Sequence, residues 1–188
     1  MRIRSPKIPP SVLTVGHSTR NLGEFVSLLL ENEISRVVDI RTVPRSRHNP
    51  QFNGETLPVA LEAAGIKYLH LPELGGLRHS RGDSPNGGWR NASFRGFADH
   101  MQTEAFASSV ERLLELAKEG RIALMCAEAV PWRCHRSLIA DALVALGIPV
   151  EHILGKGPRK IHALSPLARG KGSQIVYPPE EDLGKELP

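Results

Sequence analysis

Hydrophobic and polar positions along the chain follow two alternating patterns. Short and nearly continuous apolar runs, such as residues 11–16, predict buried strands. Between them lie segments whose apolar residues recur every three or four positions, as in residues 21–34, which is typical of helices with one buried face. Asn21 opens this segment and Glu24 follows three residues later, a spacing that predicts an N-cap.

The two patterns alternate as far as residue 154 and thereby predict a fold class. We expect strands at residues 11–16, 36–40, 67–71, 121–126 and 149–154, and helices at 21–34, 56–65, 94–120 (in one or two pieces) and 131–146. Such alternation predicts an α/β fold in which a mostly parallel, open sheet of about five strands carries helices on both faces. An eightfold barrel would need eight units and about 250 residues.

The length of 188 residues fits a single domain with flanking segments. We expect a flexible basic N-terminus at residues 1–11, an α/β domain at 12–164 and a flexible C-terminal tail at 165–188, where Pro, Gly and charged residues dominate. Residues 72–93 form a long loop rich in Gly, Asn, Ser and Arg without periodicity. Loops of this length are often functional, so we expect this one to act as a lid.

Composition narrows the class of partner. The chain contains 17 arginines and 7 lysines, with a net charge of +4 and a pI near 9.3. This balance favours an anionic partner, either a phosphate-bearing small molecule or nucleic acid. No apolar run reaches the roughly 18 residues of a membrane helix, and the N-terminus lacks the apolar core of a secretory signal. We therefore expect a cytoplasmic protein with reduced thiols and no membrane partner.

Polar residues follow each predicted strand at the point where that strand ends. In open parallel sheets these carboxyl ends form the edge that binds ligands, so we expect one shared site there. The candidates for proton transfer or nucleophilic attack are Glu128, Asp39, His17, Glu73 and Cys126. The candidates for anion binding are Arg41, Arg45, Arg133, Cys134, His135, Arg136 and Ser18.

The segment CAEAVPWRCHR, residues 126–136, is the densest group of reactive side chains. Pro131 suits the first turn of a helix, which would bring Cys134 and His135 close to a helix N-terminus. Free N–H groups at such a terminus attract anions or lower the pKa of a thiol.

Four kinds of chemistry remain open for this segment. It can form an anion cradle in which Glu128 and His135 transfer protons, or provide a cysteine nucleophile. It can also bind a metal through Cys126, Cys134 and His135, or form a redox pair of thiols. The seven-residue gap between the cysteines is not a common zinc spacing, so the sequence disfavours a metal without excluding one. The cofactor stays unknown on the sequence.

Five separated motifs carry a resemblance to a known family. They are TVGHS (14–18), VVDIRTVPRS (37–46), YLHLPELGG (68–76), MCAEAVPWRCHR (125–136) and HILGKG (152–157). In this order, over roughly residues 12–165, they resemble the bacterial family catalogued as domain of unknown function 488. The resemblance implies a compact cytosolic α/β domain, and it implies no activity.

Three functions stay open on the sequence. The first is an enzyme, a hydrolase or transferase acting on a phosphate-bearing ligand related to nucleotides or nucleic acid, because charged groups of both signs exceed what binding requires. The second is a nucleotide-binding or nucleic-acid-binding module without catalysis, which the arginine content favours although only 5% of residues are aromatic. The third is a thiol-based redox sensor using Cys126 and Cys134. These patterns do not encode an oligomeric state.

Overall fold

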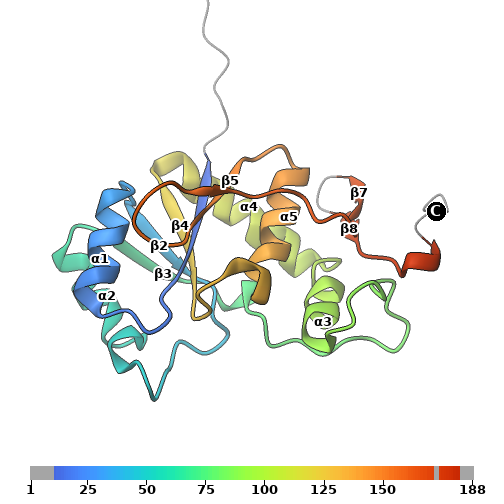
Figure 1. The fold of residues 1–188 in the computed structure, drawn as a ribbon, viewed down its shortest axis with the longest axis horizontal. Coiled ribbons are helices and arrows are strands. Elements are labelled where there is room, and N and C mark those ends of the chain that lie inside the picture. Colours follow the sequence, from blue (N-terminus) through green and yellow to red (C-terminus); the bar gives the residue numbers. More distant parts are fainter. Residues whose placement is uncertain (1–10, 172–173, 183–188) are drawn as a thin grey trace, which may run out of the picture.

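The centre of the molecule is a six-stranded sheet with the order β3-β2-β4-β1-β5-β6 (Figure 1). The computed structural model describes residues 11–171 and 174–182. Strands β1 to β5 are parallel, and only β6 pairs antiparallel, with β5. This confirms the predicted mostly parallel sheet. The strands are β1 (Val12–Gly16), β2 (Arg36–Asp39), β3 (Lys67–His70), β4 (Ile122–Cys126), β5 (Val150–Ile153) and β6 (Lys160–Ile161).

Helices cover both faces of this sheet, as predicted (Figure 1). Helices α1 and α2 pack on one face, and α3, α4 and α5 pack on the other. Within the described residues, no helix combines the length and the apolar character needed to cross a membrane. The helices are α1 (Leu22–Glu31), α2 (Leu57–Ala63), α3 (Ala92–His100), α4 (Glu104–Glu119) and α5 (Arg136–Ala145).

Each face of the sheet has its own hydrophobic core. Along β1, Leu13 and Val15 contribute to the core under α1 and α2, whereas Val12 contributes to the core under α4 and α5. Successive side chains of a strand point to opposite faces, so a strand covered on both sides must be apolar throughout. This explains why the strands appear in the sequence as continuous apolar runs.

The connections after β1 and β4 leave the sheet on opposite faces. The chain leaves β1 through α1 on one face, whereas it leaves the neighbouring β4 through α5 on the other. Such a divergence of connections opens a crevice at the carboxyl ends of the strands. The connection after β2 likewise leads to α2, on the face opposite α5, and the pocket of this edge lies between the ends of β2 and β4.

The helix after β4 starts later than predicted. Residues Pro131–Arg133 form a short 3₁₀ turn, η3, and Cys134 is extended, with φ −135° and ψ 143°. Helix α5 begins only at Arg136, with His135 as its N-cap. The backbone N–H groups of the first turn point to acceptors within the chain, among them the carbonyls of Cys134 and His135. The predicted helix over residues 131–146 with free N–H groups beside Cys134 is therefore wrong, because its proline opens a separate turn.

The described part of the predicted flexible tail contains ordered structure. Strands β7 (Arg169–Lys171) and β8 (Gln174–Val176) pair antiparallel. Tyr177 is fully buried, and its hydroxyl donates to Asp141 of α5 at 2.8 Å. The segment is mostly polar, so its few buried apolar residues form no pattern that the sequence would reveal. Residues 1–10 and 183–188 of the predicted flexible ends lie outside the described residues.

The long loop over residues 72–93 is held by α3. Asp99 accepts hydrogen bonds from the backbone N–H of Arg81 at 2.8 Å, from the Ser84 hydroxyl and from the Asn86 amide at 2.8 Å. Asn86 is fully buried and accepts from the backbone N–H of Tyr177. The middle of the loop is therefore anchored on α3 and on the C-terminal segment.

Candidate functional site

A pocket of about 370 Å³ opens at the carboxyl ends of β2 and β4. Its wall combines residues from four separate segments of the chain. They are Arg41, Thr42, Val43 and Arg45 after β2, Gly76 and Leu77 after β3, Ser93 and Phe94 of α3, and Cys126, Ala127, Glu128, Arg133, Cys134 and His135 between β4 and α5. A larger pocket of about 610 Å³ lies along the β3 edge, and its lining includes none of the predicted site residues.

Asp39 and Arg41 form a buried ion pair at the end of β2. The Arg41 Nε and Nη2 atoms donate to the two carboxylate oxygens of Asp39 at 2.9 and 2.6 Å, and the Tyr68 hydroxyl donates to the same carboxylate at 2.7 Å. Burial opposes the charge on Arg41, but the bonds to Asp39 outweigh burial and raise its pKa. Asp39 therefore holds the Arg41 guanidinium in one pose at the pocket wall.

His17 and Ser18 lie behind this pair and do not line the pocket. The His17 Nδ1 donates to the Ser18 carbonyl at 2.9 Å, and its Nε2 accepts from Arg41 Nη1 at 3.3 Å. Burial, with the nearby charge of Arg41, lowers the pKa of His17 to about 4, so the ring is neutral at pH 7. The Ser18 N–H donates to the Ala127 carbonyl at 2.9 Å, which joins the loops after β1 and β4.

Two thiols and an imidazole converge at the floor of the pocket. The Sγ atoms of Cys126 and Cys134 and a ring nitrogen of His135 all lie within 4.8 Å of one another. The neighbouring Cys134 thiol, against the opposing effect of burial and together with the charge of Arg136, lowers the pKa of Cys126 to about 7. The proximity of Cys126, together with burial, raises the pKa of Cys134.

His135 is oriented by contacts on two sides. Its Nε2 donates to the carbonyl of Ile40 at 3.3 Å, which leaves Nδ1 facing the Cys134 Sγ at 3.7 Å. A side chain on Gly76 would overlap this ring, so the glycine permits the approach of the loop after β3. Burial lowers the pKa of His135 to about 4 and keeps the imidazole neutral.

Arg136, predicted to bind anions, points away from the pocket. It is 1% exposed, and its Nη1 donates to the carbonyls of Val15 and Glu128, both at 2.9 Å. Its Nε is buried without a hydrogen-bond partner, and no carboxylate in the described ranges forms an ion pair with it. Arg136 thus ties β1 to the loop after β4 and keeps a buried positive charge near the thiols.

The rim of the pocket carries exposed charges of both signs. Glu128 is exposed, and among the described residues its side chain accepts a hydrogen bond only from the Ala129 N–H, which donates to Oε1 at 3.1 Å. Arg133 is exposed and forms no ion pair with the described carboxylates. Arg45 pairs with Glu55 at 3.3 Å, but both side chains are largely exposed, so the pair is weak. Cationic groups and one free carboxylate therefore face the same cavity.

Glu73 lies outside this arrangement. It sits in the 3₁₀ turn η2 (Pro72–Leu74), where Leu74 is buried and Glu73 is exposed, and it does not line the pocket. Within this tight turn the side chain of Leu74 points into the core, and that of its neighbour Glu73 therefore points to solvent. The sequence reasoning missed Leu77 and Phe94, which form an apolar wall, because neither belongs to a charged motif.

Comparison with known proteins identifies a family. A family model described as "Domain of unknown function DUF488" matches residues 21–143. This range contains every residue that lines the pocket, whereas His17 and Ser18 precede it. Comparisons with curated proteins and with solved structures find no match.

Proposed function

This chain belongs to the DUF488 family, and from the chemistry of its pocket we propose that it is an enzyme acting on a phosphate-bearing ligand of the nucleotide or nucleic-acid class. The observation that carries the proposal is the meeting of Arg45, Arg133 and Glu128 at one cavity, beside a fixed Arg41. A binding protein for phosphate needs the arginines, but it gains nothing from a carboxylate among them. A catalyst of proton transfer does need that carboxylate.

The arginines provide the binding part of the proposal. Guanidinium groups match phosphate oxygens with paired N–H donors. Arg133 and Arg45 are exposed and so can reach a ligand at the rim, whereas Arg41 is held in place by Asp39. The apolar wall formed by Leu77 and Phe94 suits an organic group attached to the phosphate.

Glu128 provides the proton-transfer part. In hydrolysis, its carboxylate takes a proton from the attacking water while the water oxygen bonds to phosphorus. The broken P–O bond leaves its electron pair on the departing oxygen, which takes a proton from water, and Glu128 then releases its own proton to solvent. The arginines stabilise the charge on the phosphate oxygens during this step.

Catalysis is tested by the release of inorganic phosphate from nucleoside phosphates and from a 5′-phosphorylated oligonucleotide. We expect Glu128→Gln to lower turnover by roughly 100-fold or more, the usual contribution of a general base, with ligand affinity nearly unchanged. Glu73→Gln is the matched control, because this carboxylate lies outside the pocket. Equal turnover in wild type and Glu128→Gln would remove Glu128 from the mechanism.

Binding is tested separately by titrating inorganic phosphate into the protein in a calorimeter. We expect Arg133→Gln to weaken phosphate binding by about 10-fold, a loss typical of one charged hydrogen bond. Arg47→Gln is the control, since Arg47 is exposed in the same connection after β2 but does not line the pocket. Phosphate binding without turnover of any of these substrates would instead favour the binding-module function.

The closeness of the two sulfurs favours a second candidate function, a thiol-based redox sensor. Two thiols would lose two protons and two electrons to hydrogen peroxide, which is reduced to two waters, and a disulfide would join Cys126 to Cys134. The measurement is the intact mass and the free thiol content after mild peroxide. Loss of one thiol without the other, or stable sulfinic acid on Cys126, would contradict this function.

A further inference from the structure

We propose that Cys126, Cys134 and His135 bind one zinc ion at the floor of the pocket. These three residues place their ligand atoms within 4.8 Å of one another, and all three line the same cavity. The inference deepens the proposed function, and only the role of the ion in turnover rests on that function. Binding of the ion stands on the geometry of the three side chains.

The separation between Cys134 and His135 suits a tetrahedral ion, and Cys126 lies within 4.8 Å of both. Zinc bonds of about 2.3 Å to sulfur and about 2.0 Å to nitrogen imply that neighbouring ligand atoms lie roughly 3.5–3.8 Å apart. The Cys134 Sγ and His135 Nδ1 are 3.7 Å apart, which satisfies this requirement. Thiolate and imidazole are also the ligands that select zinc over the harder cations magnesium and calcium.

The atoms around the three ligands support the same assignment. A histidine that binds metal normally donates its second ring nitrogen to a carbonyl or carboxylate, and His135 donates Nε2 to Ile40. This bond fixes the tautomer that leaves Nδ1 free to coordinate. The backbone N–H of Arg136 points at Cys134 Sγ at 3.5 Å, an N–H···S contact that stabilises a thiolate.

The charge balance around the ion is also suitable. Two thiolates and one divalent ion form a neutral group, which lowers the cost of burying them beside Arg41 and Arg136. The charge of Arg41 is already matched by Asp39. The ion therefore adds no uncompensated charge to the floor.

The three ligands leave a fourth coordination position. Because they share the pocket wall with Glu128 and Arg133, that position opens to the cavity. Three protein ligands with one open position are typical of catalytic zinc, whereas structural zinc is closed by four. A bound ion would supply a Lewis acid next to Glu128.

The direct test uses the full-length protein after removal of metal with a chelator. We expect one equivalent of Co²⁺ to produce visible d–d bands and a thiolate-to-cobalt absorption, and one equivalent of Zn²⁺ to abolish both. Wild-type protein that binds Co²⁺ without thiolate absorption, or binds no equivalent, would overturn the proposal.

Variants identify the ligands. Cys126→Ser, Cys134→Ser and His135→Gln should each weaken Zn²⁺ binding by more than about 100-fold, since even loss of an outer partner costs 10- to 100-fold. His79→Gln is the control, because His79 is exposed and does not line this pocket. Circular dichroism verifies the fold of each variant, and the Co²⁺ spectrum of the wild type keeps the test decisive if one variant unfolds. Unchanged affinity in a folded Cys134→Ser variant would contradict the site.

The same samples separate this inference from the proposed function. Arg133→Gln should keep the Co²⁺ spectrum and bind phosphate about 10-fold more weakly, whereas Cys134→Ser should lose the spectrum. Zinc binding in a protein that binds neither phosphate nor nucleotides would overturn the proposed function and leave the zinc site standing. Phosphate turnover that survives complete removal of the metal, with no Co²⁺ spectrum, would overturn the zinc site and leave the proposed function standing.

Discussion

Single glycines allow the walls of the pocket to approach one another. A side chain on Gly16, the last residue of β1, would overlap the carbonyl oxygen of Glu128. A side chain on Gly76 would overlap the ring of His135. Backbone of the loop after β4 lies directly against Gly16, and an imidazole ring lies directly against Gly76. The position of Glu128 and the orientation of His135 therefore depend on residues that carry no chemistry of their own.

Replacement of Gly16 by alanine tests this dependence. The added methyl group would collide with backbone rather than with a flexible side chain, so we expect a loss of about 1–3 kcal/mol in the free energy of unfolding. Urea denaturation measures the change. Gly23→Ala is the control, because Gly23 lies in α1 with only an ordinary contact to Asn21, and alanine in a helix is neutral or stabilising. A Gly16→Ala protein as stable as wild type would show that the loop after β4 yields easily.

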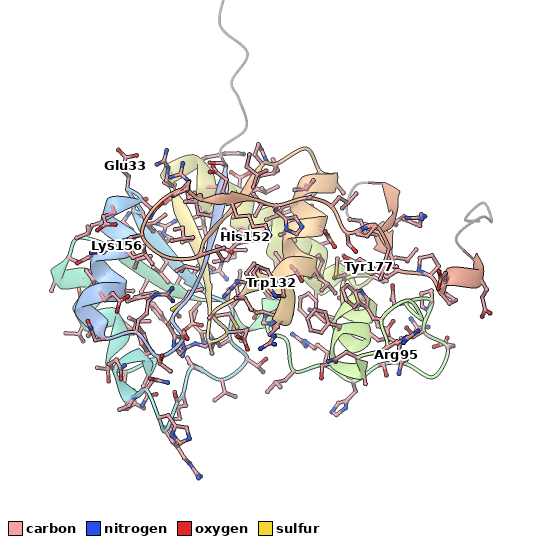
Figure 2. All side chains as sticks on the ribbon, viewed as in Figure 1. Glu33, Arg95, Trp132, His152, Lys156 and Tyr177 are labelled. Carbon is pink, nitrogen blue, oxygen red and sulfur yellow. The ribbon has the colours of Figure 1, made fainter. Side chains whose placement is uncertain are left out.

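At the scale of elements, α5 is joined to the C-terminal segment by one carboxylate. Asp141 accepts from the Tyr177 hydroxyl and from His162 Nε2, both at 2.8 Å, and from the Ser165 N–H at 2.9 Å. Tyr177 lies beside α5, as Figure 2 shows. Since α5 follows directly on the ligands Cys134 and His135, this carboxylate also anchors one wall of the pocket.

Tyr177→Phe removes one of these bonds and keeps the ring. We expect the free energy of unfolding to fall by about 2 kcal/mol, the usual value for a hydrogen bond to a charged group. Hydrogen exchange should rise over residues 174–177. Val59→Ala is the control, because Val59 is 69% exposed on α2 and such substitutions change stability by less than about 0.5 kcal/mol. Unchanged exchange in Tyr177→Phe would mean that apolar burial alone holds the segment.

At the scale of the whole molecule, a chain of hydrogen bonds crosses from the sheet to α5. The Thr14 hydroxyl bonds to His152 Nδ1 at 2.7 Å, His152 Nε2 bonds to His162 Nδ1 at 2.9 Å, and His162 bonds to Asp141. His152 is labelled in Figure 2. Burial, with the charges of His162, Arg136 and Lys160, lowers the pKa of His152 to about 3. His152 is thus neutral in the folded protein at pH 7.

This burial predicts sensitivity of the fold to acid. Between the ordinary pKa of 6.5 and about 3, the unfolded chain binds a proton at His152 and the folded chain does not. The free energy of unfolding should therefore fall as pH drops through this window. Urea denaturation at several pH values should give a shallower fall for His152→Gln than for wild type. The exposed His48→Gln variant is the control, and equal slopes in all three proteins would contradict the prediction.

The whole-molecule arrangement also decides where a ligand can bind. Neighbouring strands β2 and β4 send their connections to opposite faces, which opens the sheet edge between their carboxyl ends. The pocket that unites the arginines, Glu128 and the thiols lies at this edge. The four segments that line it extend over 94 positions of the chain, from Arg41 to His135.

The sequence by itself determined the alternation of strands and helices, the Asn21 cap and the polar edge of the sheet. These features depend on residues a few positions apart, so their periodicity is visible along the chain. Only the tertiary structure decided which candidates face one cavity. It directed Arg136 inward to backbone carbonyls, left Glu73 outside and brought Cys126 to Cys134 and His135 across a turn. Packing between distant segments sets such distances, and no local pattern records them.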